Sequence, residues 1–267
     1  MQVQGISLVL SDPLLFPEAI ERYADAIGMI SPDAASATGV GYFDGDEPLI
    51  AKYHPPVSAN LVQLMGKLNS NVALATSLGP GSEEVSGRNI QPFRYRNWLF
   101  SMSGTVGRFN SEREVQLAIP TYIRENVRGD TVAEMLFHQV LAFLHRQGLL
   151  AGERWEISPL RTALKGAMSL DDVWFEDGEP DCSLMLTDGR ILLGAALGRP
   201  VYVQKIEGLE PESPDPALLK STRFHSRARG AIFLDTNSLV SEQWETIGPN
   251  TLFQVDTNFE VETFSLD

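Results

Sequence analysis

Few side chains in this sequence are arranged for ordinary catalysis. The four histidines are His54, His138, His145 and His225. His138 and His145 are seven residues apart, a spacing that could bring two metal ligands together on one helix face. The neighbouring Gln139 and Arg146 favour a solvated helix surface instead. The one cysteine, Cys182, has no histidine near it in sequence, so we interpret it as a small buried hydrophobic residue.

Common cofactor and protease motifs are absent from the sequence. It contains no GxGxxG, no Walker-type GK[ST] loop, no HExxH and no GxSxG. These motifs build phosphate cradles, zinc sites and nucleophile elbows. We therefore expect neither a bound metal ion nor a cofactor.

The most informative residues lie between positions 89 and 104. The run Asn89-Ile90-Gln91-Pro92-Phe93 precedes an aromatic, strand-like segment at 95–102 that ends in Ser103-Gly104. This stretch resembles the class II glutamine amidotransferases, especially their small stand-alone branch. In that branch an Asn-Thr-His-Pro-Phe motif precedes an aromatic strand that ends in His-Asn-Gly.

The resemblance runs along nearly the whole chain. Residues 39–43 are similar to the family's Gly-Trp-Gly-Val-Gly segment, 186–189 to its Leu-Thr-Asp-Gly turn and 249–255 to its final hairpin. The order and spacing of these segments imply a single domain over residues 1–267. The family implies an α/β fold of the N-terminal-nucleophile hydrolase type, a four-layer αββα sandwich in which helices flank two packed antiparallel sheets.

The resemblance also implies a chemistry. In the family, a cysteine at position two attacks the side-chain amide of glutamine, with its own α-amino group as the base. The Asn-Gly pair holds the resulting oxyanion. An arginine and an aspartate bind the α-carboxylate and α-amino groups of the substrate.

This chain departs from the family at each of those positions. Position two is Gln2, whose amide is not a nucleophile, and the methionine before so large a residue is expected to remain. Ser103 stands at the oxyanion asparagine, so Gly104 alone keeps a backbone donor. Leu78 and Val132 fall at the arginine and aspartate that hold the substrate. We therefore predict that glutaminase activity has been lost.

Three functions remain compatible with such a chain. The favoured prediction is a non-catalytic scaffold or regulatory subunit, with an active amidotransferase homologue or a synthetase as its protein partner. A second is an enzyme with altered chemistry, and a third is a small-molecule sensor that uses the old cleft. Arg88 and Asp130 could replace the substrate-binding residues in part. Hydroxyl groups and bases for altered chemistry would come from Thr76, Ser77, Ser103, Glu83, Glu84 or Asp130.

The composition indicates which classes of partner are disfavoured and in which compartment the protein is expected. Of 267 residues 43% are hydrophobic, which is enough for one sizeable core. A formal net charge of −14 disfavours nucleic acid and anionic membrane surfaces as partners. One cysteine fits a reducing compartment, and the start of the chain lacks the basic residues of a secretory signal. These features predict a cytoplasmic protein.

The pattern of apolar residues predicts the elements that position these side chains. Strands are expected at 6–10, 72–78, 98–102, 201–206, 230–234, 251–255 and 259–264. Hairpins are expected across Asp44-Gly45 and Asp188-Gly189. Helices are expected after Ser11-Asp12-Pro13, after Ser58, from Thr131 to Gly148 and from Ser158, with capping boxes at 111–114 and 131–134.

Overall fold

The strands of the protein form two antiparallel layers. The computed structural model describes residues 2–30, 37–54, 60–79, 86–105, 116, 118–150, 157–168, 181–209, 225–236 and 241–266. Within these ranges, thirteen strands form one continuous hydrogen-bonded arrangement. It divides into two layers at β1 and β6, which pair only through Gln2 with Thr105 and Val3 with Gly104.

The first sheet has the order β11-β9-β10-β1-β4-β2-β3. Its strands are β1 (Gln2–Leu10), β2 (Ala37–Asp44), β3 (Glu47–Tyr53), β4 (Val72–Leu78), β9 (Val201–Glu207), β10 (Arg229–Asp235) and β11 (Glu245–Ile247). The second sheet has the order β5-β6-β7-β8-β12-β13. Its strands are β5 (Phe93–Tyr95), β6 (Trp98–Thr105), β7 (Asp181–Thr187), β8 (Leu192–Leu197), β12 (Thr251–Val255) and β13 (Val261–Ser265).

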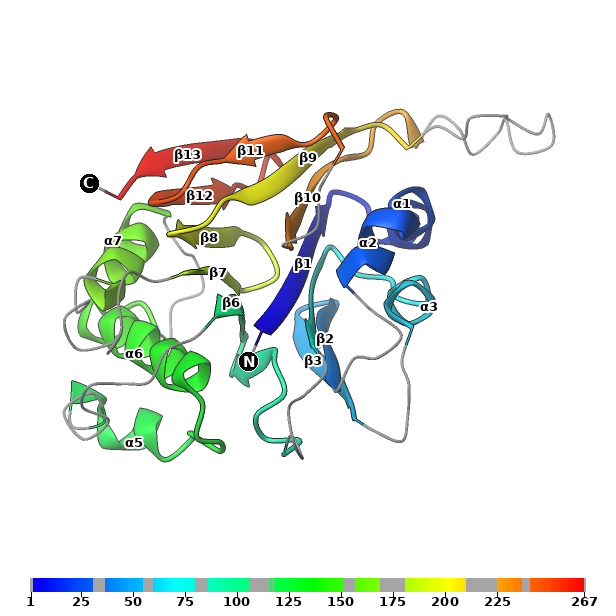
Figure 1. Ribbon diagram of the computed structural model, residues 1–267. Helices are drawn as coiled ribbons and strands as arrows, with labels where there is room; N and C mark the ends of the chain where they lie inside the picture. The colour runs from blue at the N-terminus through cyan, green and yellow to red at the C-terminus, as the bar shows by residue number, and fades with distance from the viewer. Residues whose placement is uncertain are drawn as a thin grey trace, which may run out of the picture.

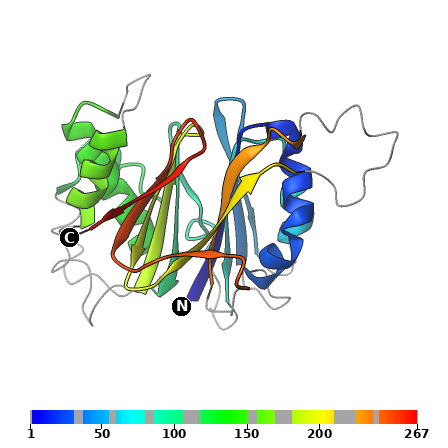
Figure 2. The ribbon, with the colours of Figure 1, turned by 90° about the horizontal axis from the view of Figure 1, so that it is seen from above.

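Helices cover the outer face of each sheet (Figures 1 and 2). On the first sheet these are α1 (Phe16–Arg22), α2 (Ala24–Ile30) and α3 (Leu61–Met65), after a short 3-10 helix at Pro13–Leu15. On the second sheet they are α5 (Thr121–Arg124), α6 (Val132–Arg146) and α7 (Ile157–Met168). A third apolar core joins the two sheets, for example Val9 and Phe233 with Leu99 and Phe253. The predicted four-layer αββα sandwich is therefore confirmed.

Helix α6 begins and ends where the sequence predicts. The Thr131 hydroxyl accepts a hydrogen bond from the Glu134 amide at 3.2 Å. The Glu134 carboxylate accepts from the amides of Arg128 and Gly129 at 2.9 and 2.6 Å, and so satisfies donors just before the helix. Gly148 follows directly after the last turn.

The prediction of a solvated His138 is wrong. His138 is only 2% exposed, and its Nδ1–H donates to the Glu134 carbonyl oxygen at 2.8 Å. Burial lowers the pKa of this imidazole, although the Glu134 carbonyl and carboxylate oppose the shift. His145 is exposed, as predicted. Helix α6 lies between α5 and α7 in the layer that covers the second sheet (Figure 1), and the His138 ring meets the Tyr95 ring of β5 edge to face, so this part of the helix is not solvated.

Other differences from the sequence predictions are small. The last strand begins at Val261 because the Asp256 carboxylate accepts from the amides of Asn258 and Glu260 and closes a turn there. The helix expected after Ser58 begins at Leu61 with Asn60 as its cap, since Asn60 Oδ1 accepts from the Gln63 amide. Ser58 itself and the capping box at 111–114 lie outside the described residues. Four elements, α2, α5, β5 and β11, were not predicted from the sequence.

Candidate functional site

Three of the positions matched to the family meet at the start of β1. Gln2 pairs with Thr105, and Val3 pairs with Gly104 on one side. On its other side Val3 pairs with Leu78, the last residue of β4. The backbone thus places the nucleophile position between the oxyanion position and one of the substrate-binding positions.

Ser103 and Gly104 are both fixed by close backbone contacts. Ser103 is 4% exposed, and a Cβ atom placed on Gly5 would overlap its hydroxyl. Gly104 has φ of +97°, and a Cβ there would overlap the Asp181 carbonyl oxygen. The Ser103 hydroxyl therefore faces β1, and only glycine is accommodated at position 104.

The two substrate-binding positions are apolar. Leu78 packs with Ala37 and Ile90, and Val3 lies against this small cluster. Val132, the first residue of α6, is partly buried against the helical core of the second sheet. Neither side chain carries a group that could bind the charged end of an amino acid.

The two candidate substitutes differ in their surroundings. Asp130 accepts a hydrogen bond from the Asn89 side-chain amide at 2.6 Å, and its own amide donates back to Asn89 Oδ1 at 3.2 Å. Arg88 is exposed, and its amide donates to the Ser86 hydroxyl at 3.4 Å. Asp130 thus holds the segment 89–93 against the start of α6.

Gln91 stands where the family has the histidine of Asn-Thr-His-Pro-Phe, and here it fastens two segments together. Its side-chain Nε2 donates to the Met102 carbonyl oxygen at 2.8 Å, and its Oε1 accepts from the Met102 amide at 2.6 Å. Its backbone carbonyl accepts from the Thr76 hydroxyl at 3.0 Å. The side-chain amide and the backbone carbonyl of Gln91 thus form hydrogen bonds that link β4 to β6.

The hydroxyl groups considered for altered chemistry point in different directions. Thr76 and Ser77 are consecutive in β4, so their side chains lie on opposite faces of the sheet. Thr76 is engaged with Gln91, and Ser103 faces Gly5. Glu83 and Glu84 lie outside the described residues.

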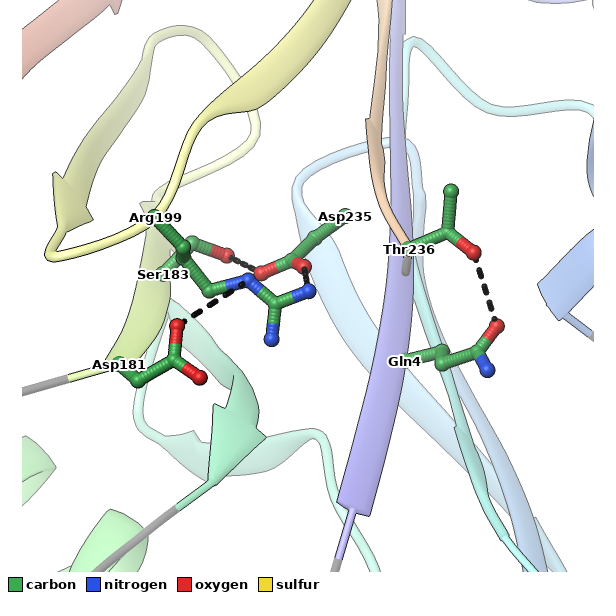
Figure 3. Close-up of polar contacts among 6 residues, drawn as sticks. All are labelled: Gln4, Asp181, Ser183, Arg199, Asp235 and Thr236. Atoms are coloured by element: carbon green, nitrogen blue, oxygen red, sulfur yellow. Dashed lines mark hydrogen bonds and ion pairs between the residues drawn. The ribbon is translucent and has the colours of Figure 1, made fainter. Parts of the chain in front are cut away.

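A buried charged network that the sequence analysis missed lies between the sheets (Figure 3). Arg199, in the turn between β8 and β9, has Nη2 2.7 Å from Asp235 Oδ1 at the end of β10. Ser183 of β7 donates to the other Asp235 oxygen. Arg199 Nε also lies 3.9 Å from Oδ1 of Asp181, whose side chain is exposed at the edge of this network. The inward alternation of β10 places Asp235 on the same face as Phe233, and this is the one sequence signal that pointed to it.

Burial raises the pKa values of two side chains in this region, Asp235 and Cys182. It raises the pKa of Asp235 to about 6, while Arg199 and the Ser183 hydroxyl act in the opposite direction. Burial also raises the pKa of the Cys182 thiol to about 12. Cys182 packs fully buried in the helical core of the second sheet, which confirms its prediction as a small hydrophobic residue. At neutral pH its sulfur is not a thiolate nucleophile.

Neither a metal cluster nor a membrane span is found in the described part of the chain. Within those ranges no group of three or more His, Cys, Asp or Glu side chains could hold a metal ion. The helices that the structure describes are too short or too polar to cross a membrane.

Comparison with known proteins identifies the fold. No protein-family model and no curated protein match the sequence. A glutamine aminotransferase class-II domain protein from Silicibacter pomeroyi matches over 98% of both chains, with a TM-score of 0.59 at 18% identity. The chain has the fold of the class II glutamine amidotransferases.

Two further structures share this amidotransferase fold. A predicted glutamine amidotransferase from Pseudomonas aeruginosa matches over 98% of this chain and 99% of its own, with a TM-score of 0.57 at 13% identity. Glutamine phosphoribosylpyrophosphate amidotransferase from B. subtilis matches over 99% of this chain but 49% of its own, with a TM-score of 0.54 at 10% identity. The likeness therefore extends over the whole amidotransferase fold, and at these identities it concerns the fold alone.

Proposed function

We propose that this protein is a class II amidotransferase homologue, one domain in all, that does not hydrolyse glutamine and acts as a non-catalytic subunit of a protein complex. Its partner is an active amidotransferase homologue or a synthetase, which the subunit supports as a scaffold or regulator. The compartment in which it acts is the cytoplasm.

The observation that carries the loss of activity is the junction at the start of β1. Gln2, Gly104 and Leu78 are brought together by the pairing of Val3 with both β4 and β6. Of the family's reacting groups, only the Gly104 backbone remains at this junction. A missing nucleophile alone removes several orders of magnitude in rate, and one lost oxyanion donor removes about a hundred- to a thousandfold.

The persistence of the fold supports a role as a subunit. Buried contacts around the former site, such as those of Gln91 with Met102, are satisfied by groups that do no chemistry. A stable fold without a nucleophile is what a scaffold requires, because binding a partner uses the surface and not the reacting atoms.

Ammonia release from glutamine tests the loss of activity. Full-length protein at high concentration should release no more ammonia than a blank without protein, while an active class II amidotransferase serves as the positive control. Release well above the blank would overturn the proposal. The Gln2→Cys/Ser103→Asn variant should also remain close to the blank, because Leu78 and Val132 still cannot hold the substrate.

Purification from the native host tests the subunit role. The protein should elute with a partner in fixed stoichiometry in size-exclusion chromatography with mass measurement by light scattering. Elution without any stoichiometric partner would overturn this part of the proposal.

One observation favours a sensor as the second candidate. The apolar cluster of Ala37, Leu78 and Ile90 stands where the family binds the charged end of glutamine. An apolar metabolite is the ligand class that such a cluster would accept. A rise in the melting temperature with one member of an apolar metabolite panel, lost in Leu78→Asn, is the result expected of a sensor.

A further inference from the structure

A groove of about 920 Å³ lies outside the former amidotransferase site. It is lined by the end of α1, by α2, by the second half of β9 and by residues 241–245. Figure 1 shows α1 and α2 beside the end of β9. None of its lining residues belongs to the junction at the start of β1.

One wall of the groove is an incompletely paired strand edge. β11 pairs with β9 only through Glu245 with Val203, Thr246 with Tyr202 and Ile247 with Val201. Residues 204–207 of β9 pair with β10 on the inner side, whereas no strand of the described ranges pairs with their outer side. Backbone N–H and C=O groups on such an edge can pair with an added strand.

An aromatic pair lies next to this edge. Trp244 directly precedes β11, and its ring meets that of Tyr23 edge to face, with centroids 6.3 Å apart. Tyr23 is 9% exposed and Trp244 is partly exposed, and both line the groove. Met29, 39% exposed, adds a flexible apolar side chain. This surface can receive the apolar side chains on one face of an added strand.

Three carboxylates, Asp25, Glu207 and Glu245, and two cationic side chains, Arg22 and Lys205, line the groove, so its formal charge is −1. Arg22 donates to the Gly208 carbonyl oxygen at 2.7 Å, and Lys205 lies 3.8 Å from Glu245. Asp25 and Glu207 are exposed carboxylates, and neither has an ion-pair partner among the described residues. The whole chain carries −14, so a basic occupant is also favoured at long range.

We propose that this groove binds an extended, basic segment of a partner protein, which adds as a strand to the outer edge of β9. Alternate side chains of the segment lie on Trp244 and Tyr23, and its lysine or arginine residues pair with Asp25 and Glu207. This inference rests on the proposed function, because it assigns a surface to the partner of a non-catalytic subunit.

Labelled synthetic peptides test the proposal by fluorescence anisotropy. A decapeptide of alternating valine and lysine should bind saturably, and one of alternating valine and glutamate at least about tenfold more weakly. A valine–lysine peptide with N-methylated backbone amides keeps its charge but cannot pair as a strand, so it should not bind. Equal binding of the methylated peptide would overturn strand addition.

Variants of matched charge locate the binding site. Asp25→Lys/Glu207→Lys should abolish binding of the lysine peptide and create binding of the glutamate peptide. Glu18→Lys/Glu21→Lys has the same net charge, lies outside the groove lining and should behave as wild type. Equal effects of the two pairs would overturn the proposal in favour of long-range attraction.

Further measurements test the role of Trp244 and distinguish a partner segment from a second copy of this chain. Trp244→Ala, checked for folding by circular dichroism, should weaken the lysine peptide at least about tenfold. A dimer in sedimentation equilibrium that Trp244→Ala dissociates would overturn the proposal in favour of a second copy. If no peptide binds, but the protein has a stoichiometric partner and releases no ammonia, the groove is not the binding site and the proposed function still stands. Ammonia release would overturn the proposed function itself.

Discussion

Arg199 Nη2 lies 2.7 Å from Asp235 Oδ1 inside the protein, with 7% and 1% of the two side chains exposed (Figure 3). Asp235 belongs to β10 of the first sheet, and Ser183 of β7 in the second sheet donates to its other oxygen. A single carboxylate thus bridges the two sheets.

Removing Arg199 should destabilise the protein strongly. Arg199→Met leaves Asp235 buried without its counter-charge, which should lower the free energy of unfolding in urea by about 3–5 kcal/mol. Asp46→Asn breaks the exposed 3.7 Å pair with Arg190 and is the matched control, with an expected loss of about 1 kcal/mol or less. Losses of the same size in both variants would contradict a structural role for the buried pair.

The stability contribution of Asp235 should depend on pH. Its folded-state pKa of about 6 is above that of an unfolded aspartate, so the folded protein holds this proton more tightly. The resulting stability is full below about pH 4 and is lost as the pH rises through about 6. In urea unfolding, the free energy of unfolding of the wild type minus that of Asp235→Asn should therefore fall from about pH 4 to about pH 7, by on the order of 1–3 kcal/mol. A difference that is constant or grows with pH would contradict the raised pKa.

Gly5 and Ser103 should show strong energetic coupling. Gly5→Ala places a methyl group on the Ser103 hydroxyl and should cost about 1–3 kcal/mol of the free energy of unfolding. Ser103→Ala removes the hydroxyl, so the double variant should recover most of that loss. Thermal unfolding of the four proteins in the cycle measures the coupling, and strictly additive losses would rule out the contact.

Gln91 should be needed for the stability of the fold. Gln91→Ala leaves the buried amide and carbonyl of Met102 without partners, at a cost of about 1–3 kcal/mol for each. Gln63→Ala on the exposed face of α3 should change the free energy of unfolding by less than about 0.5 kcal/mol. If urea unfolding finds Gln91→Ala as stable as Gln63→Ala, the link between β4 and β6 through Gln91 is unimportant.

Local patterns in the sequence were sufficient for most elements, whereas the four-layer αββα sandwich was implied by the resemblance to the class II glutamine amidotransferases. The hairpin turn at Asp188 needs only its own carboxylate, which accepts from the amides of Arg190 and Ile191. The Thr131 cap of α6 likewise depends on a residue three positions away. Short elements such as β11 were missed because three residues carry too little periodicity to be recognised.

The sequence by itself determined which groups stand at the positions matched to the family's nucleophile and oxyanion residues, because the identities of Gln2 and Ser103 need no coordinates. Only the tertiary structure decided how those positions are surrounded. His138 is buried because its ring packs edge to face against Tyr95 of β5, 43 positions earlier in the chain, and against Phe137. Arg199 and Asp235 are 36 positions apart in the sequence, and the pairing of β9 with β10 brings them together. Over such a separation the spacing in the sequence does not indicate a distance in space. Burial then sets the pKa of Asp235, since the cost of removing a charge from water depends on every segment packed around it.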